Sequence, residues 1–152
     1  IAAYAAQNYG AHRIDRIKQG VNASLLIVES CAIIMALLIF MVEPLIVPLF
    51  VNNPTAEIFS YARDYFIVVL PFYPMLGLLV IYRTTDQAMN LTWVPLAACL
   101  AELLARCTSA ILLARIAGYK GIAFSHPLAW CSACLIVIPA YYCYMKKINQ
   151  NN

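Results

Sequence analysis

The order of apolar and polar positions divides the chain into four long apolar stretches separated by short polar segments. The stretches lie at about residues 21–42, 61–82, 93–115 and 121–145. Each is close to the ~20 residues that a helix needs to cross the hydrocarbon core of a bilayer. Because the apolar runs are continuous rather than alternating, they predict helices and not barrel strands.

The residues between these stretches predict where the helices end. Pro44 and Pro48 predict an end of the first helix near Phe50, and the following Asn-Asn-Pro-Thr sequence is typical of a turn. Residues 1–9 form a run of small and aromatic residues that reads as the end of a further helix. The predicted fold is therefore all-α: a polytopic membrane helix bundle of four transmembrane helices and the tail of a preceding one. Since the chain begins with Ile1, we expect a fragment whose N-terminal portion is missing.

Composition supports a membrane protein and excludes several other classes. Hydrophobic residues make up 64% of the chain and charged residues 11%, whereas soluble domains are about half apolar and a quarter charged. The net charge of +3 is small and spread along the chain, so no nucleic-acid partner is expected. All six cysteines fall inside apolar stretches, which argues against a disulfide framework or a zinc site. No cofactor or metal is predicted.

Lysine and arginine positions predict the orientation. Six of these residues flank one side of the predicted spans and three flank the other; the six are Arg13, Arg16, Lys18, Arg83, Lys146 and Lys147, and the three are Arg63, Arg115 and Lys120. Cytoplasmic loops carry the excess of positive residues. We therefore expect residues 10–20, residues 83–92 and the C-terminus to be cytoplasmic.

The third stretch carries Glu102 and Arg106 close to its midpoint. Ionisable groups at this depth cost at least ~2.5–3.5 kcal/mol each on insertion scales, so they normally pair or line a pathway. Glutamate four residues before arginine is the favourable order for a helical ion pair. Two interpretations stay open: an internal pair that fixes packing, and a pair of which one member lies on an ion or substrate path.

Further candidates for a transport path lie in the first two stretches. Pro71 and Pro74 predict a bend halfway through the second stretch, and interrupted helices at mid-membrane are where transporters place binding sites. Tyr73 would supply an aromatic ring and a hydroxyl there. Asp64 and Glu29 are included as intramembrane acids, although both are close enough to a membrane face for their side chains to extend toward the interface.

Two other classes of membrane protein are alternatives to a transporter. Cys131 and Cys134 form a C-x-x-C pair, as in membrane thiol–disulfide oxidoreductases, but reactive cysteines belong at helix N-termini or in loops, and this pair lies inside an apolar stretch. The other is a purely structural four-helix subunit. No enzyme activity is predicted.

Several short segments together resemble the multidrug and toxic compound extrusion transporters. The matching segments, in chain order, are residues 6–11 with Arg13, Arg16 and Gly20; Tyr82, Arg83, Gln87, Met89, Thr92 and Pro95; residues 101–106; and residues 118–123, 127–130 and 138–141. Asp86 and Asn90 depart from the family pattern, since an apolar residue and glycine are usual there. Asp86 is expected to add a charge to a loop.

The resemblance implies that residues 1–152 are part of the C-terminal lobe, with the end of the eighth helix followed by helices nine to twelve and a genuine C-terminus at Asn152. It implies export of organic cations or drugs by antiport with Na⁺ or H⁺, in the bacterial inner membrane. The missing N-terminal lobe and helices seven and eight would be partners, and the chain alone should not transport. A flippase of lipid-linked sugars, from the same superfamily, is the alternative. No glycine-rich phosphate loop that would indicate ATP binding is present.

Overall fold

The computed structural model describes residues 1–151, which form an all-helical bundle, as predicted; the expected C-terminus at Asn152 lies outside them. The elements are α1 (Ala2–Gly10), α2 (Ile14–Phe50), α3 (Ala56–Val69), the 3-10 turn η1 (Leu70–Phe72), α4 (Tyr73–Ala88) and α5 (Trp93–Asn151). The end of α2 at Phe50 confirms the break expected from Pro44 and Pro48. Residues 1–9 lie almost entirely in α1, so the predicted helical tail is present.

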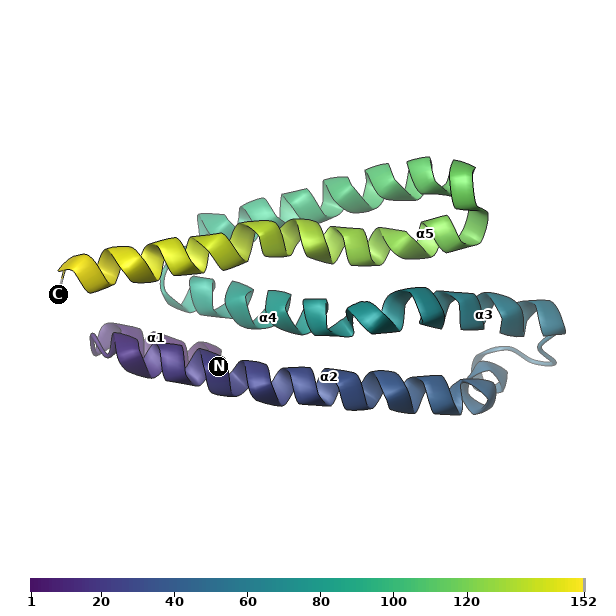
Figure 1. Cartoon of the computed structure of the whole chain (residues 1–152), viewed down its shortest axis with the longest axis horizontal. Coiled ribbons are helices and arrows are strands. Elements are labelled where there is room, and N and C mark those ends of the chain that lie inside the picture. Colours follow the sequence, from purple (N-terminus) through teal and green to yellow (C-terminus); the bar gives the residue numbers. More distant parts are fainter. Residues whose placement is uncertain (152) are drawn as a thin grey trace.

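The helix α5 is a hairpin of two helices. Gly118 has φ 56° and ψ −132°, a backbone conformation that reverses the chain direction between the two halves (Figure 1). Three continuous segments are long and apolar enough to cross a membrane: α2, the α3–α4 segment and α5. Because α5 folds back at Gly118, it contributes two such segments, so residues 1–151 contain four potential crossings.

The second crossing is interrupted near its middle. A 3-10 turn at Leu70–Phe72 separates α3 from α4, with Pro71 inside the turn and Pro74 in the first turn of α4. Proline lacks the amide hydrogen that a continuous α-helix would donate here. The interruption expected from these two prolines is confirmed.

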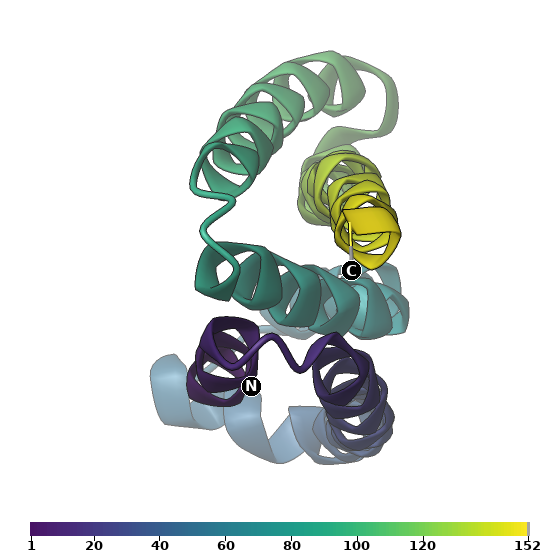
Figure 2. The ribbon, with the colours of Figure 1, turned by 90° about the vertical axis from the view of Figure 1, so that its left-hand side faces the viewer.

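The helix α4 lies at the centre of the bundle, between α2 on one side and α5 on the other (Figures 1 and 2). It contributes buried residues on both sides, among them Leu79, Ile81 and Tyr82. Tyr82 Oη is 3.1 Å from Tyr142 Oη of α5, and Tyr9 Oη of α1 is 2.6 Å from Tyr144 Oη. These contacts join the two halves of the chain at one end of the bundle.

The chain reversals gather at two ends of the molecule. Residues 11–13, residues 89–92 and the last turns of α5 lie at one end, whereas residues 51–55 and Gly118 lie at the other (Figure 1). The first end is the one with the larger number of lysine and arginine residues. The helices therefore place the segments with more lysine and arginine residues at one end of the bundle and those with fewer at the other, as the predicted orientation requires.

Candidate functional site

The carboxylate of Glu102 binds two guanidinium groups, one with each oxygen. Arg106, one turn further along α5, donates to Glu102 Oε1 at 2.8 Å. Arg83 of α4 donates to Glu102 Oε2 at 2.7 Å. The predicted pair of Glu102 and Arg106 is thus present, but it is part of a three-residue group, which we call the Arg83–Glu102–Arg106 cluster.

The cluster carries one more positive than negative charge. The Glu102 side chain is 19% exposed and the Arg83 side chain 28%, so both are largely enclosed by the bundle. Arg83 Nε is buried and has no hydrogen-bond partner within residues 1–151. Hydrogen bonds to charged groups contribute about 1.5–3 kcal/mol each. The arrangement therefore ties α4 to α5 and leaves a positive field around Glu102 that disfavours direct binding of another cation.

Sequence reasoning placed Arg83 among the charges flanking a span and missed its contact with Glu102. The loop of residues 89–92 is short, so α4 and the first half of α5 must be antiparallel neighbours. Arg83 lies six residues before this loop and Glu102 ten residues after it, a difference of about 6 Å along a helix that the long arginine side chain can span. Counting residues away from this loop along both helices is the signal that could have indicated a contact between Arg83 and Glu102.

Glu29 lies in the middle of α2 and faces α4. A Cβ atom added to Gly77 of α4 would be 2.7 Å from Glu29 Oε1, so the absence of a side chain at Gly77 makes room for this carboxylate. Glu29 Oε1 is buried and has no hydrogen-bond partner among the described residues. The expectation that Glu29 extends toward an interface is wrong, because glycine opposite this position leaves a place for the carboxylate between two helices.

Tyr73, Pro71 and Pro74 lie at the interruption of the second crossing but face different neighbours. The Tyr73 ring packs edge-on against Trp130 of α5, with centroids 6.2 Å apart. Tyr73 and Gly77 also line a shallow depression between α2 and α4. Pro71 and Pro74 instead line a separate apolar groove beside α2.

Asp64 forms an ion pair with Lys120 that joins α3 to the second half of α5. The distance from Lys120 Nζ to Asp64 Oδ1 is 3.1 Å, and Lys120 is two residues from the reversal at Gly118. The side chain of Asp64 is 27% exposed. The candidates therefore occupy separate places: the cluster around Glu102, the contact of Glu29 with Gly77, and this terminal ion pair.

Asp86 is a buried acid, contrary to the expectation of a loop charge. It lies in the last turn of α4 and is 0% exposed. Its backbone carbonyl accepts a hydrogen bond from Leu91 N, but both carboxylate oxygens are without a partner in residues 1–151. The burial of Asp86 was not predicted, because the polar residues 83–92 looked like a loop. In the structure α4 continues to Ala88 and packs into the core.

The two cysteines of the C-x-x-C pair lie inside a helix, away from the helix N-terminus. Cys134 is buried and its Sγ lies 3.5 Å from the carbonyl oxygen of Met75, and both Cys131 and Cys134 are free thiols within the second half of α5. No group of three or more His, Cys, Asp or Glu side chains within residues 1–151 is arranged to hold a metal ion.

Comparison with known proteins identifies the family. The family model described as MatE matches residues 1–112, which include α1 to α4 and the Arg83–Glu102–Arg106 cluster. No curated protein and no solved structure gives a match. Since the match covers most of the chain, and the apolar helices are those of an integral membrane protein, the chain belongs to the MatE family of membrane transporters.

Proposed function

We propose that this chain forms part of the C-terminal lobe of a secondary transporter that exports organic cations from a bacterial cell in exchange for Na⁺ or H⁺. We further propose that its C-terminus is cytoplasmic and that Glu29 is the acid through which this part of the protein senses the coupling ion. The observation that carries the second proposal is the buried, unpartnered Oε1 of Glu29. An intramembrane carboxylate is costly to retain and normally marks an ion path or a paired position.

Two of the acids inside the bundle, Glu102 and Glu29, differ in their availability for binding a cation. Glu102 already accepts from Arg83 and Arg106, so binding a cation there requires breaking charge-assisted hydrogen bonds. Glu29 has no such competitor, and proton or Na⁺ binding would remove its unfavourable charge. Tyr73, which lines the same α2–α4 depression as Gly77, adds an aromatic face of the kind that attracts organic cations.

The test uses the full transporter of which this chain is part, reconstituted in liposomes with an imposed Na⁺ or H⁺ gradient and a fluorescent organic cation. Glu29→Gln should lower gradient-driven transport at least about tenfold, which corresponds to 1.4 kcal/mol. Asp15→Asn is the matched control, because Asp15 is an acid of the same helix with a side chain that is 92% exposed. Unchanged gradient dependence in the folded Glu29→Gln protein would exclude the role of Glu29.

The net positive charge of the Arg83–Glu102–Arg106 cluster specifically favours a second candidate, a flippase of anionic lipid-linked sugars. A site with surplus guanidinium groups suits phosphate better than an organic cation. The same liposomes, loaded with a lipid-linked pyrophosphate sugar, distinguish the two functions. Movement of this lipid, reduced by Arg106→Gln, together with no cation transport, would replace the antiport proposal.

A further inference from the structure

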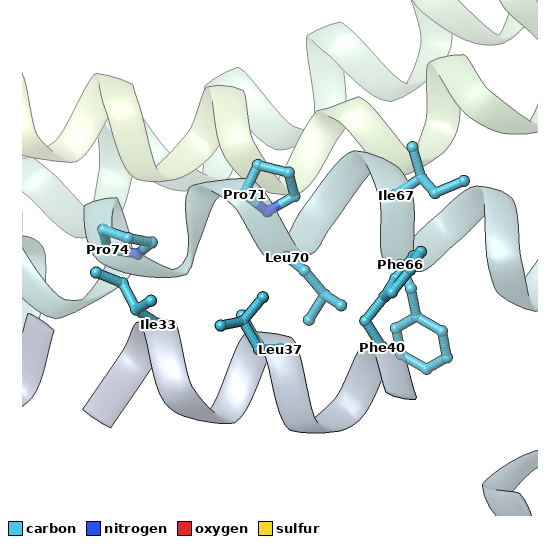
Figure 3. Close-up of a pocket in the computed structure, with 9 residues that line it drawn as sticks. Ile33, Leu37, Phe40, Phe66, Ile67, Leu70, Pro71 and Pro74 are labelled. Atoms are coloured by element: carbon cyan, nitrogen blue, oxygen red, sulfur yellow. The ribbon is translucent and has the colours of Figure 1, made fainter. Parts of the chain in front are cut away.

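An apolar groove runs between α2 and the α3–α4 segment, on the outside of the bundle (Figure 3). Its volume is about 430 Å³. The lining residues are apolar and come from both sides: Ile33, Leu37 and Phe40 from α2, and Phe66, Leu70 and Pro74 from the facing segment. Ile33 and Phe40 are seven residues apart, which is ~10 Å along a helix. The groove is therefore elongated parallel to the crossing helices.

A positive charge lies at one end of this groove. The guanidinium carbon of Arg63 is 6.0 Å from the centroid of the Phe40 ring, and Phe40 lines the groove. Arg63 precedes Phe66 by one turn of α3, so it lies beyond the groove on the side of residues 51–55. The opposite end, at Ile33 and Pro74, points toward the middle of the crossing (Figure 3).

Arg63 has no acidic partner in the described part of the chain. The four ion pairs within residues 1–151 involve other cations, and Arg63 is exposed. The nearest acid along the helix, Asp64, is engaged by Lys120. Arg63 thus presents a free guanidinium at the end of a long apolar groove.

We infer that this groove binds an anionic phospholipid, with one acyl chain along α2 and the phosphate at Arg63. The hydrocarbon core is about 30 Å thick, so one leaflet is about 15 Å deep. A groove of ~10 Å that starts at a membrane face matches most of that depth. Guanidinium groups bind phosphate through paired charge-assisted hydrogen bonds. The apolar walls and the terminal charge together match the two parts of one lipid molecule.

The size of the groove favours a flexible chain over a helix as its occupant. A helix is about 10–12 Å across with its side chains. The groove has a volume of only about 430 Å³, which is too small for a helix of that width and of the groove's length. An acyl chain contacts both walls.

The test is photocrosslinking of the protein in nanodiscs with phosphatidylglycerol or phosphatidylcholine that carries a diazirine in the acyl chain. Crosslinked peptides are identified by mass spectrometry. We expect residues 33–40 and 66–74 to be labelled several-fold more by the phosphatidylglycerol probe. Arg63→Gln should reduce this labelling to the level of phosphatidylcholine. Arg115→Gln, which removes an exposed arginine near the same end, should leave the preference unchanged.

A second variant tests the groove apart from the charge. Leu37→Trp fills the groove and should reduce labelling by both probes. Equal labelling of the wild-type protein by the two lipids would overturn the inference, as would a preference that survives Arg63→Gln. Labelling of residues 33–40 no stronger than that of the exposed residues Leu100, Leu103 and Leu104 would show that the groove holds lipid no better than any exposed helix face, and would overturn the inference as well.

Discussion

Arg83 of α4 and Glu102 of α5 are joined by a hydrogen bond of 2.7 Å between their charged groups. The two residues belong to different crossings, and Glu102 is also held by Arg106 from its own helix. The carboxylate of Glu102 therefore links α4 to α5 at this point of the bundle.

A double-mutant cycle measures what this bond contributes. Arg83→Met and Glu102→Gln should each lower the free energy of unfolding, and the double variant should be less destabilised than the sum of the two. The expected coupling is about 1.5–3 kcal/mol, the range for hydrogen bonds to charged groups. Unfolding in mixed detergent micelles, followed by circular dichroism, supplies the measurement. Additive losses would show that the bond contributes nothing to stability.

Replacement of Asp86 by asparagine should stabilise the protein. Asp86 is fully buried, and neither carboxylate oxygen has a partner within residues 1–151. Asparagine has nearly the same shape and carries no charge, so it avoids the part of the desolvation penalty that a buried charge adds to the about 1–3 kcal/mol of an unsatisfied neutral group. Thermal unfolding in detergent should give a higher midpoint. Asp15→Asn, at an exposed acid, should leave the midpoint unchanged, and a lower midpoint for Asp86→Asn would contradict the prediction.

The hairpin of α5 requires glycine at two positions, for a different reason at each: the backbone conformation at Gly118 and the close packing at Gly121. Gly118 has φ 56° and ψ −132°, a conformation that only glycine adopts readily and where alanine costs on the order of 1–3 kcal/mol. Gly121 does not have a positive φ, but it lies against Leu113, whose backbone carbonyl would collide with a Cβ atom at this position. Gly121→Ala should therefore destabilise the protein more than Gly118→Ala, because backbone cannot move aside as a side chain can.

Gly10 provides the control for both substitutions. A Cβ atom there would meet nothing within 4 Å. Gly10→Ala should change the unfolding midpoint little, since alanine also favours helix over glycine. If Gly10→Ala were as damaging as Gly121→Ala, a general effect of alanine and not the close approach to Leu113 would be responsible.

Chemical labelling tests the proposed orientation. In a variant without native cysteines, Asn52→Cys and Ala11→Cys place single thiols at exposed positions at opposite ends of the bundle. A membrane-impermeant maleimide added to intact cells should label residue 52 and should label residue 11 only after permeabilisation. The reverse pattern would invert the orientation derived from lysine and arginine positions.

The sequence predicted those features that depend on neighbours along one helix. The ion pair of Glu102 and Arg106 follows from their spacing of four, and the interruption at Leu70–Phe72 follows from Pro71. The contacts of Arg83 and Asp86 could not be obtained this way, because they depend on which helices become neighbours. Both residues lie in the last turns of α4, where a charged residue looks like part of a loop until the helix is seen to continue inside the bundle.

The position of Glu29 is a second feature that could not be predicted from the sequence, because it depends on a contact between two helices. Its position near the start of an apolar stretch suggested an interfacial acid, whereas Gly77, 48 positions later in the chain, provides the space in which its carboxylate lies. A glycine in one helix gives no indication of the residue opposite it in another. Only the packing of α2 on α4 brings the two together.

The central place of α4 has a mechanical consequence. Gly77 and Arg83 are six residues apart on this helix, so their directions differ by about 120° around its axis, and they face α2 and α5 respectively. A rotation of α4 about its own axis would thus alter the space around Glu29 and the bond to Glu102 in a single movement. An ion that binds at Glu29 would then affect the face of α4 that packs on α5, without any contact between Glu29 and Glu102.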